Sequence, residues 1–167
     1  MNIEERLIEG NRIFKSNVDK QLLEKLSKGQ SPYALILCCS DSRVVPEEIF
    51  SCSLGELFVI RTAGNVINEG ELASIEYGIE HLHIQYVLVL AHTHCGAVHA
   101  AIHNEKGKYL SPILDNIKAS ICDECDERKV SIKNAIKQVK YLKSKFPGLK
   151  GEIKSALYDI ETGEVIF

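Results

Sequence analysis

Three clusters of polar residues each follow a short apolar run, and two of them contain side chains that suit metal chemistry. The clusters are Cys39-Ser-Asp-Ser-Arg43, Arg61-Thr-Ala-Gly-Asn65 and His92-Thr-His-Cys95-Gly96. Thiolates, imidazoles and carboxylates are the protein groups that bind zinc. The first and third clusters supply all three kinds of group, so the sequence predicts a metal site to which both contribute.

Spacing selects the ligands within these clusters. Cys39 and Asp41 stand where a strand passes into a turn, so both side chains can face one ion. His92 and Cys95 have the H-x-x-C spacing, which closes on one ion across a single turn. Together the four groups would give zinc the tetrahedron of ligands that it prefers. Cys38 is expected to be a small buried residue instead, because adjacent residues of a strand point to opposite faces.

The elements that must position these clusters can be read from hydrophobic periodicity. Continuous apolar runs predict strands buried on both faces at 33–39, 57–60 and 86–91. Helical spacing of apolar residues predicts helices at 3–17, 19–29, 69–82, 96–104, 112–121 and 131–146, with Ser131 capping the last. Residues 155–167 are expected to form two strands around Thr162-Gly163, and loops are expected at 104–109 and 122–131.

Strands that alternate with helices predict an α/β fold. We expect a single domain over residues 1–167, with a mostly parallel central sheet flanked by helices and an antiparallel edge at the C-terminus. Ligands of open parallel sheets bind beyond the carboxyl ends of the strands. The three polar clusters stand at such ends, which is where a catalytic site is expected.

Composition excludes several other classes of protein. The chain has 167 residues, of which 45% are hydrophobic and 26% charged, as in an ordinary globular domain. A net charge of −3 offers no basic surface for nucleic acid, and no apolar run approaches the roughly 20 residues of a membrane span. The acidic N-terminus does not resemble a signal peptide. We therefore expect a cytoplasmic protein, whose six cysteines serve metal binding or burial.

At the polar clusters the sequence resembles the β-class carbonic anhydrases, in their compact microbial form. The matching stretches are Cys39-Ser-Asp-Ser-Arg43-Val-Val-Pro46, Arg61-Thr-Ala-Gly-Asn65 and His92-Thr-His-Cys95-Gly96, together with Gln30 ahead of them. The likeness runs from about residue 29 to residue 103. Paired motifs at this separation are highly specific for the family.

The resemblance implies a zinc enzyme that hydrates CO2 reversibly to bicarbonate and a proton, with zinc-bound hydroxide as the nucleophile. By family position, zinc would be held by Cys39, His92 and Cys95, and its fourth position would be filled by Asp41 or by water. Arg43 would pair with Asp41 whenever the carboxylate is off the metal. Asp41 and Arg43 are therefore the expected catalytic residues.

The same resemblance implies a substrate pocket shared between subunits. Residues that would contact bicarbonate or line its pocket are Gln30, Phe58, Ala63 and Gly96. Gln30 would donate a hydrogen bond to bicarbonate, and Gly96 would lie beside the metal. Tyr77 would reach the site of the other subunit, because the family builds each site at a dimer interface. A homodimer or a higher homo-oligomer is expected, with the N-terminal helices over residues 1–28 packing on the partner.

Some positions depart from the family pattern, and other functions stay open. Thr62 stands where the family has Asn, and Ala91 stands where it has Gly; both are small and leave the expected ligands intact. Relatives of the family hydrolyse carbonyl sulfide or carbon disulfide at the same kind of site. A non-enzymatic, zinc-stabilised binding module and a redox protein built on Cys122 and Cys125 are more distant alternatives.

Overall fold

The computed structural model describes residues 2–122 and 126–167. Contacts divide the chain into an N-terminal unit, residues 1–31, and a main unit, residues 32–167. The expectation of one domain over the whole chain stays a prediction. No helix among the described residues is both long and apolar enough to cross a membrane.

The N-terminal unit consists of two helices, α1 (Ile3–Asn17) and α2 (Lys20–Leu26). Asn2 and Glu5 form a reciprocal capping box at the start of α1, and the Asp19 side chain caps α2. Several apolar side chains of α1 are exposed, namely Ile3, Leu7, Ile8, Ile13 and Phe14. The amphipathic helix expected from the sequence is therefore present, with an uncovered apolar stripe.

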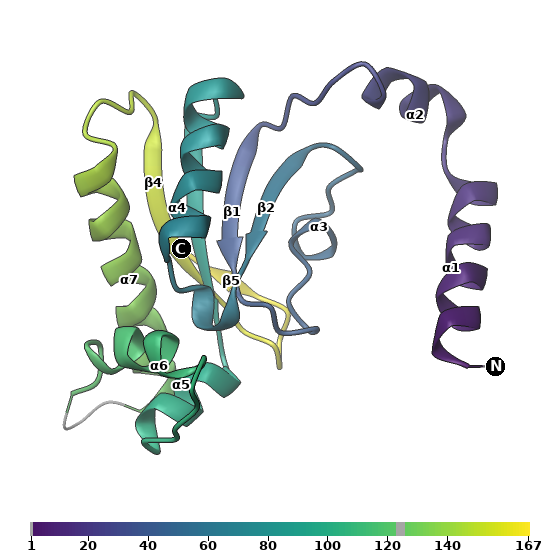
Figure 1. The fold of residues 1–167 in the computed structure, drawn as a ribbon. Helices are drawn as coiled ribbons and strands as arrows, with labels where there is room; N and C mark the ends of the chain where they lie inside the picture. The colour runs from purple at the N-terminus through teal and green to yellow at the C-terminus, as the bar shows by residue number, and fades with distance from the viewer. Residues whose placement is uncertain (1, 123–125) are drawn as a thin grey trace. The chain divides into compact units, whose positions relative to one another are not determined.

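The main unit is built on a five-stranded sheet in the order β2-β1-β3-β4-β5 (Figure 1). Its strands are β1 (Ala34–Cys38), β2 (Leu57–Arg61), β3 (Tyr86–His92), β4 (Glu152–Tyr158) and β5 (Val165–Ile166). The first four run parallel and β5 is antiparallel to β4, so the predicted fold class is confirmed. The chain leaves β1 for β2 on one side and then crosses to β3 on the other. This reversal of strand order makes the carboxyl ends of β1 and β3 the expected place for a ligand.

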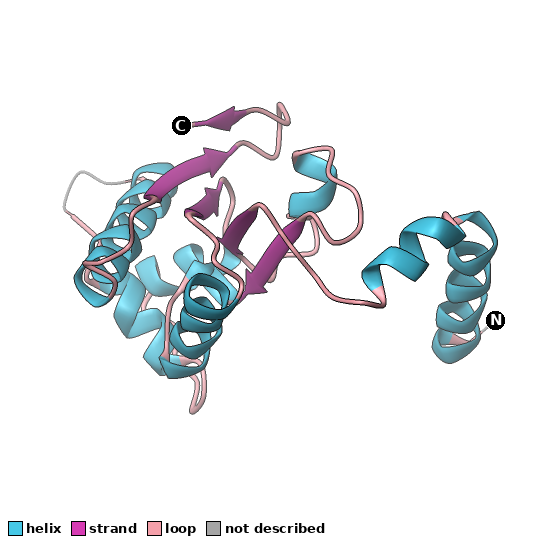
Figure 2. Cartoon of the chain, turned by 90° about the horizontal axis from the view of Figure 1, so that it is seen from above, coloured by secondary structure: helices cyan, strands magenta, loops and turns pink. Residues whose placement is uncertain are grey.

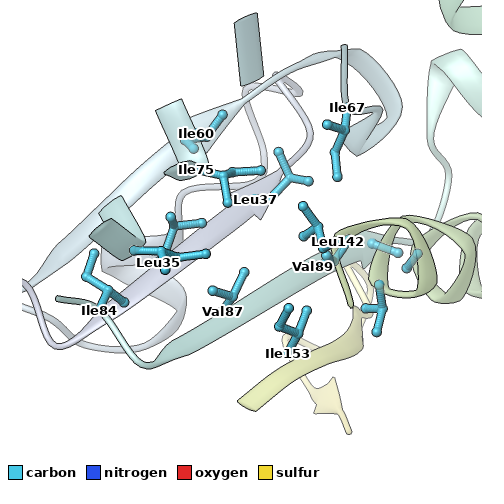
Figure 3. Close-up of a cluster of buried hydrophobic side chains, with 14 of the residues drawn as sticks. Leu35, Leu37, Ile60, Ile67, Ile75, Ile84, Val87, Val89, Leu142 and Ile153 are labelled. Atoms are coloured by element: carbon cyan, nitrogen blue, oxygen red, sulfur yellow. The ribbon is translucent and has the colours of Figure 1, made fainter. Parts of the chain in front are cut away.

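Helices pack on the sheet and beyond its carboxyl edge (Figure 2). They are α3 (Pro46–Ile49), α4 (Glu69–Glu76), α5 (Gly96–Ile102), α6 (Ser111–Lys118) and α7 (Glu127–Lys145), with a 3₁₀ turn at Ala63–Asn65 and a π turn at Tyr77–His81. One sheet face packs against α4 and α7 through a core that includes Leu35, Leu37, Ile75 and Leu142 (Figure 3). Burying such side chains supplies most of the driving force for folding.

Strand alternation decides which cysteine reaches which side. Leu35 and Leu37 point toward α4 and α7, whereas Ile36 and Cys38 join the core on the opposite face, beside Val44. Cys38 is fully buried there, and burial raises the pKa of its thiol to about 12. The expectation that Cys38 is a core residue is therefore confirmed.

The C-terminal third departs from the prediction in its boundaries. Helix α7 begins at Glu127, with Asp126 as its cap, so the predicted loop over 122–131 is too long and Ser131 does not cap the helix. The Ser131 hydroxyl instead donates to the carbonyl of Glu127 within the helix. Strand β4 begins at Glu152, three residues earlier than expected, because its register with β3 extends from Tyr86 to His92.

Other helices end a few residues before their predicted ends. Helix α4 ends at Glu76, where the predicted helix over 69–82 continues as the π turn. Helices α5 and α6 end at Ile102 and Lys118, before the predicted ends at 104 and 121. The short helix α3 was not predicted, because four residues carry too little periodicity to reveal a helix.

Candidate metal centre and active site

The carboxyl ends of β1 and β3 bring three metal-ligating side chains together. Cys39 follows β1 directly, His92 is the last residue of β3, and Cys95 stands immediately before α5. One donor atom from each lies within 4.8 Å of the others, and all three residues are buried. The two sulfurs are 4.0 Å apart. This arrangement fits the geometry of a site in which all three bind one ion.

His92 presents a free nitrogen to this cluster. Its Nδ1 lies 2.8 Å from the carbonyl oxygen of Thr93. A carbonyl can only accept a hydrogen bond, so Nδ1 carries the proton and Nε2 has the lone pair. Nε2 is buried and has no hydrogen-bond partner among the described residues. A buried polar atom without a partner is rare, and a metal ion would satisfy it.

The thiols of Cys39 and Cys95 shift each other's pKa in opposite directions. The hydrogen bond from Cys95 lowers the pKa of Cys39 to about 4, and the same contact raises the pKa of Cys95. Backbone amides also support each sulfur: the amides of Gly64 and Asp41 lower the pKa of Cys39, and those of Val98 and Ala97 act on Cys95. These contacts favour the thiolate at Cys39, and the thiolate is the form of cysteine that binds metal.

Asp41 is held by Arg43 rather than gathered with the three ligands. Arg43 Nε and Nη2 donate to Asp41 Oδ1 and Oδ2 at 2.9 and 2.7 Å, and the backbone amide of Arg43 donates to Oδ1. These hydrogen bonds hold the pKa of Asp41 well below its usual range, so the carboxylate is ionised. Arg43 also donates to the carbonyl of His94, which fixes the guanidinium against the loop that carries Cys95.

The cluster that follows β2 supports the loop after β1. Arg61 donates to the carbonyl oxygens of Cys39 and Asp41 at 3.3 and 2.8 Å, and the amide of Gly64 donates to Cys39 Sγ at 3.3 Å. Gly64 has φ +64°, and a Cβ there would lie 2.7 Å from Ile117 Cδ1. Sequence reasoning assigned no role to Arg61 or Gly64. The signal was an arginine and a glycine after the predicted strand at 57–60. That strand was expected to be buried on both faces, but β2 is only partly buried because it lies at the edge of the sheet.

The expected pocket residues do not all meet at this cluster. Ala63 precedes Gly64, whose amide donates to Cys39 Sγ, and Gly96 follows Cys95, so both are next in sequence to residues of this group. Phe58 stands three residues before Arg61 in β2, roughly 10 Å back along the strand, where its ring centroid is 6.2 Å from that of Tyr77. Tyr77 is 46% exposed. Gln30 is an exposed residue of the N-terminal unit.

His94, the other histidine of the third polar cluster, is not part of this group of ligands. His94 is exposed, and its Nε2 is 3.3 Å from a carboxylate oxygen of Glu161. Cys125, which the redox alternative requires, lies outside the described residues, so that hypothesis stays untested. The structure thus separates Cys39, His92 and Cys95 from the remaining cysteines and histidines that it describes.

Comparison with known proteins shows the family to which the chain belongs. Residues 34–165 match the family model for carbonic anhydrase. A carbonic anhydrase of Synechococcus elongatus is 36% identical over 96% of this chain and 70% of its own length, and one of Synechocystis is 34% identical over 97% and 70%. The solved β-carbonic anhydrase CcaA superposes with a TM-score of 0.85 at 33% identity, covering 98% of this chain and 94% of that one.

A second solved structure extends the likeness in fold. Tetrameric β-carbonic anhydrases of Sordaria macrospora share 23% identity and a TM-score of 0.81, over 98% of this chain and 92% of theirs. The chain has the α/β fold of these enzymes and a Cys-His-Cys cluster, positioned for metal binding, at the ends of two central strands. The chain belongs to the carbonic anhydrase family, within the β class.

Proposed function

We propose that this chain hydrates CO2 reversibly to bicarbonate and a proton, with a zinc ion held by Cys39, His92 and Cys95. The observation that supports this most is the Nε2 of His92, which is buried near two thiol sulfurs and has no hydrogen-bond partner in the part of the chain that the structure describes. Catalytic zinc sites use three protein ligands and keep one position open. When bound there, zinc would supply a water of lowered pKa, and so a hydroxide nucleophile near neutral pH.

Two thiolate ligands make the neighbouring carboxylate more important. Their charges cancel that of the divalent ion, so such a site acidifies water less than one built from neutral imidazoles. Asp41 is ionised and fixed by Arg43, so it can accept a hydrogen bond from the attacking hydroxyl and orient its lone pair toward CO2. Released from Arg43, the same carboxylate would become a fourth ligand and exclude water.

We propose the remaining substrate contacts from the places of the residues in the chain and in the fold. Ala63 and Gly96 are next in sequence to Gly64 and Cys95 and would border the CO2 pocket. Phe58 and Tyr77 pair at a separate, partly exposed place, which suits a contribution to the site of a second subunit. Gln30, from the N-terminal unit, would donate to bicarbonate. A cytoplasmic location stays a prediction from composition.

Assembly as a homodimer or a higher homo-oligomer follows from the same proposal. The apolar stripe of α1 is exposed in the single chain, and burying it against a partner subunit would remove that surface from water. The Sordaria macrospora relatives are described as tetrameric, which is the kind of assembly expected here.

The first test is stopped-flow hydration of CO2 by protein whose zinc content has been assayed, from pH 6.5 to 9, roughly the range in which zinc-bound water ionises. The expected result is activity that rises with pH at about one zinc per chain. No activity at full zinc occupancy and high pH would reject CO2 hydration. Turnover of carbonyl sulfide in the same assay would then favour a hydrolase that uses this site. No turnover of either would favour a binding module.

A further inference from the structure

We propose that Asn134 and Gln138, two buried amide side chains on α7, are positioning residues for the metal centre. They fix the segment over residues 64–67 so that the amide of Gly64 donates to the sulfur of Cys39. This inference rests on the proposed role of Cys39 as a metal ligand.

The contact that matters is the 3.3 Å hydrogen bond from the Gly64 amide to Cys39 Sγ. Hydrogen bonds to a ligating sulfur fix its direction and withdraw electron density from the metal. Partners of this kind typically change metal affinity or activity about 10- to 100-fold when they are lost. The position of one backbone amide is therefore a property that the rest of the fold must maintain.

The segment that carries this amide is held at both ends by α7. Asn134 Nδ2 donates to the carbonyl oxygen of Gly64 at 2.8 Å, and Gln138 Oε1 accepts from the amide of Ile67 at 3.4 Å. Gly64 also packs closely on Ile117 of α6, where a Cβ would not fit. The left-handed conformation of Gly64 is thus enclosed by contacts with two helices.

The two amides form one network. Gln138 Nε2 donates to Asn134 Oδ1 at 3.1 Å and to Asn116 Oδ1 of α6 at 2.9 Å. Asn134 is fully buried and Gln138 is 2% exposed. Burying amides costs free energy unless their hydrogen bonds are made, and in this network they are made. The two amide side chains make hydrogen bonds to the backbone of residues 64–67 and so fix its position. Apolar side chains could not make these hydrogen bonds.

The test compares Asn134→Ala with Ser131→Ala, both prepared as full chains loaded with Zn²⁺ or Co²⁺. Ser131 is also buried on the same helix, but among the described residues its hydroxyl bonds only to the carbonyl of Glu127. Three readouts are measured: the rate of Zn²⁺ loss to a chelator, the thiolate-to-Co²⁺ charge-transfer band, and hydrogen exchange over residues 60–68 of the metal-free protein. None of them requires turnover.

The expected result is that Asn134→Ala releases Zn²⁺ about 10- to 100-fold faster, shifts the charge-transfer band and speeds exchange over residues 60–68. Ser131→Ala should match the wild type in all three. If Asn134→Ala folds and equals Ser131→Ala in every readout, the positioning role is wrong.

A second variant keeps the inference testable if Asn134→Ala does not fold. Asn116→Ala removes the outer end of the network at a half-buried position, and it should shift the same readouts in the same direction by a smaller factor. No shift in that variant would overturn the inference. Inactive wild-type enzyme with shifted readouts would instead refute CO2 hydration alone, because Zn²⁺ loss and the Co²⁺ spectrum are independent of the reaction.

Discussion

Arg43 binds the Asp41 carboxylate through two hydrogen bonds, of 2.9 and 2.7 Å, and so keeps it out of the group formed by Cys39, His92 and Cys95. A bidentate guanidinium–carboxylate pair is directional as well as strong. The pair therefore sets both the charge of Asp41 and its distance from the ligands, and the first prediction concerns its removal.

Arg43→Ala should lower kcat/KM for CO2 hydration about 10- to 100-fold. Without the guanidinium, Asp41 is free to occupy the fourth position at the metal, and the loss should be greatest at low pH, where hydroxide competes least. Stopped-flow assays from pH 6.5 to 9, roughly the ionisation range of zinc-bound water, measure both effects. Lys154→Ala, which removes an exposed ion pair of 2.8 Å with Glu152, is the control. An unchanged pH profile would contradict the proposed role of Arg43.

Asp41→Asn should keep the fold and the zinc content while kcat falls by about 100-fold or more. The amide preserves the shape of the side chain but replaces one acceptor oxygen with a donor, and it no longer pairs with Arg43 as an ion. Thermal unfolding, metal analysis and kcat measured on one preparation separate the outcomes. A large loss of stability with retained turnover would indicate a structural carboxylate instead.

Substitution of Cys39 and substitution of its neighbour Cys38 should have different effects on zinc content and stability. Cys39→Ala should remove zinc and the stabilisation that metal binding gives, because a ligand of the native state stabilises it by mass action. Cys38→Ala should keep about one zinc per chain and lose only on the order of 1 kcal/mol of stability, since Cys38 lies in the core on the other sheet face. Metal analysis and unfolding with and without chelator measure this. Equal zinc loss in both variants would refute the ligand assignment.

Lys137 should make the free energy of unfolding depend on pH, independently of any metal. Burial lowers its pKa, so the folded state disfavours the charged form. The resulting cost to stability is present at neutral pH and declines as the pH rises from the folded pKa toward the unfolded value, about 10.4. Lys137→Met keeps the aliphatic stem without the charge. The stability of the variant relative to wild type should fall between pH 7 and about 10, as measured by urea unfolding; a constant difference would contradict the shift.

The apolar stripe of α1 should control assembly. Leu7→Glu places a charge on that stripe, where Leu7 is 70% exposed in the single chain, and should shift the protein toward smaller species in light scattering. Ser16→Glu adds the same charge on the opposite side of α1 and should leave the mass unchanged. Identical masses for wild type and Leu7→Glu would show that this stripe does not form the interface.

The sequence specified the strands and most of the ligand set because both depend on local patterns. Apolar runs ending in Cys39 and His92 indicated buried strands and polar carboxyl ends, and strand alternation excluded Cys38 correctly. The ends of the helices and strands were predicted less accurately than their presence. The residues from Glu127 to Val130 are mostly polar, so the sequence predicted a loop there. In the structure they form the first turn of α7, which Asp126 caps.

What only the tertiary structure decided is how distant groups meet. The hydrogen bond from Arg43 to the carbonyl of His94 and the hydrogen bond from Arg61 to the carbonyl of Asp41 depend on the side-by-side placement of β1, β2 and β3. Asn134 reaches Gly64 across 70 residues of sequence. Local propensity carries no information about such contacts, because they form only when packed helices and strands bring the backbone and side chains of separate segments within hydrogen-bonding distance.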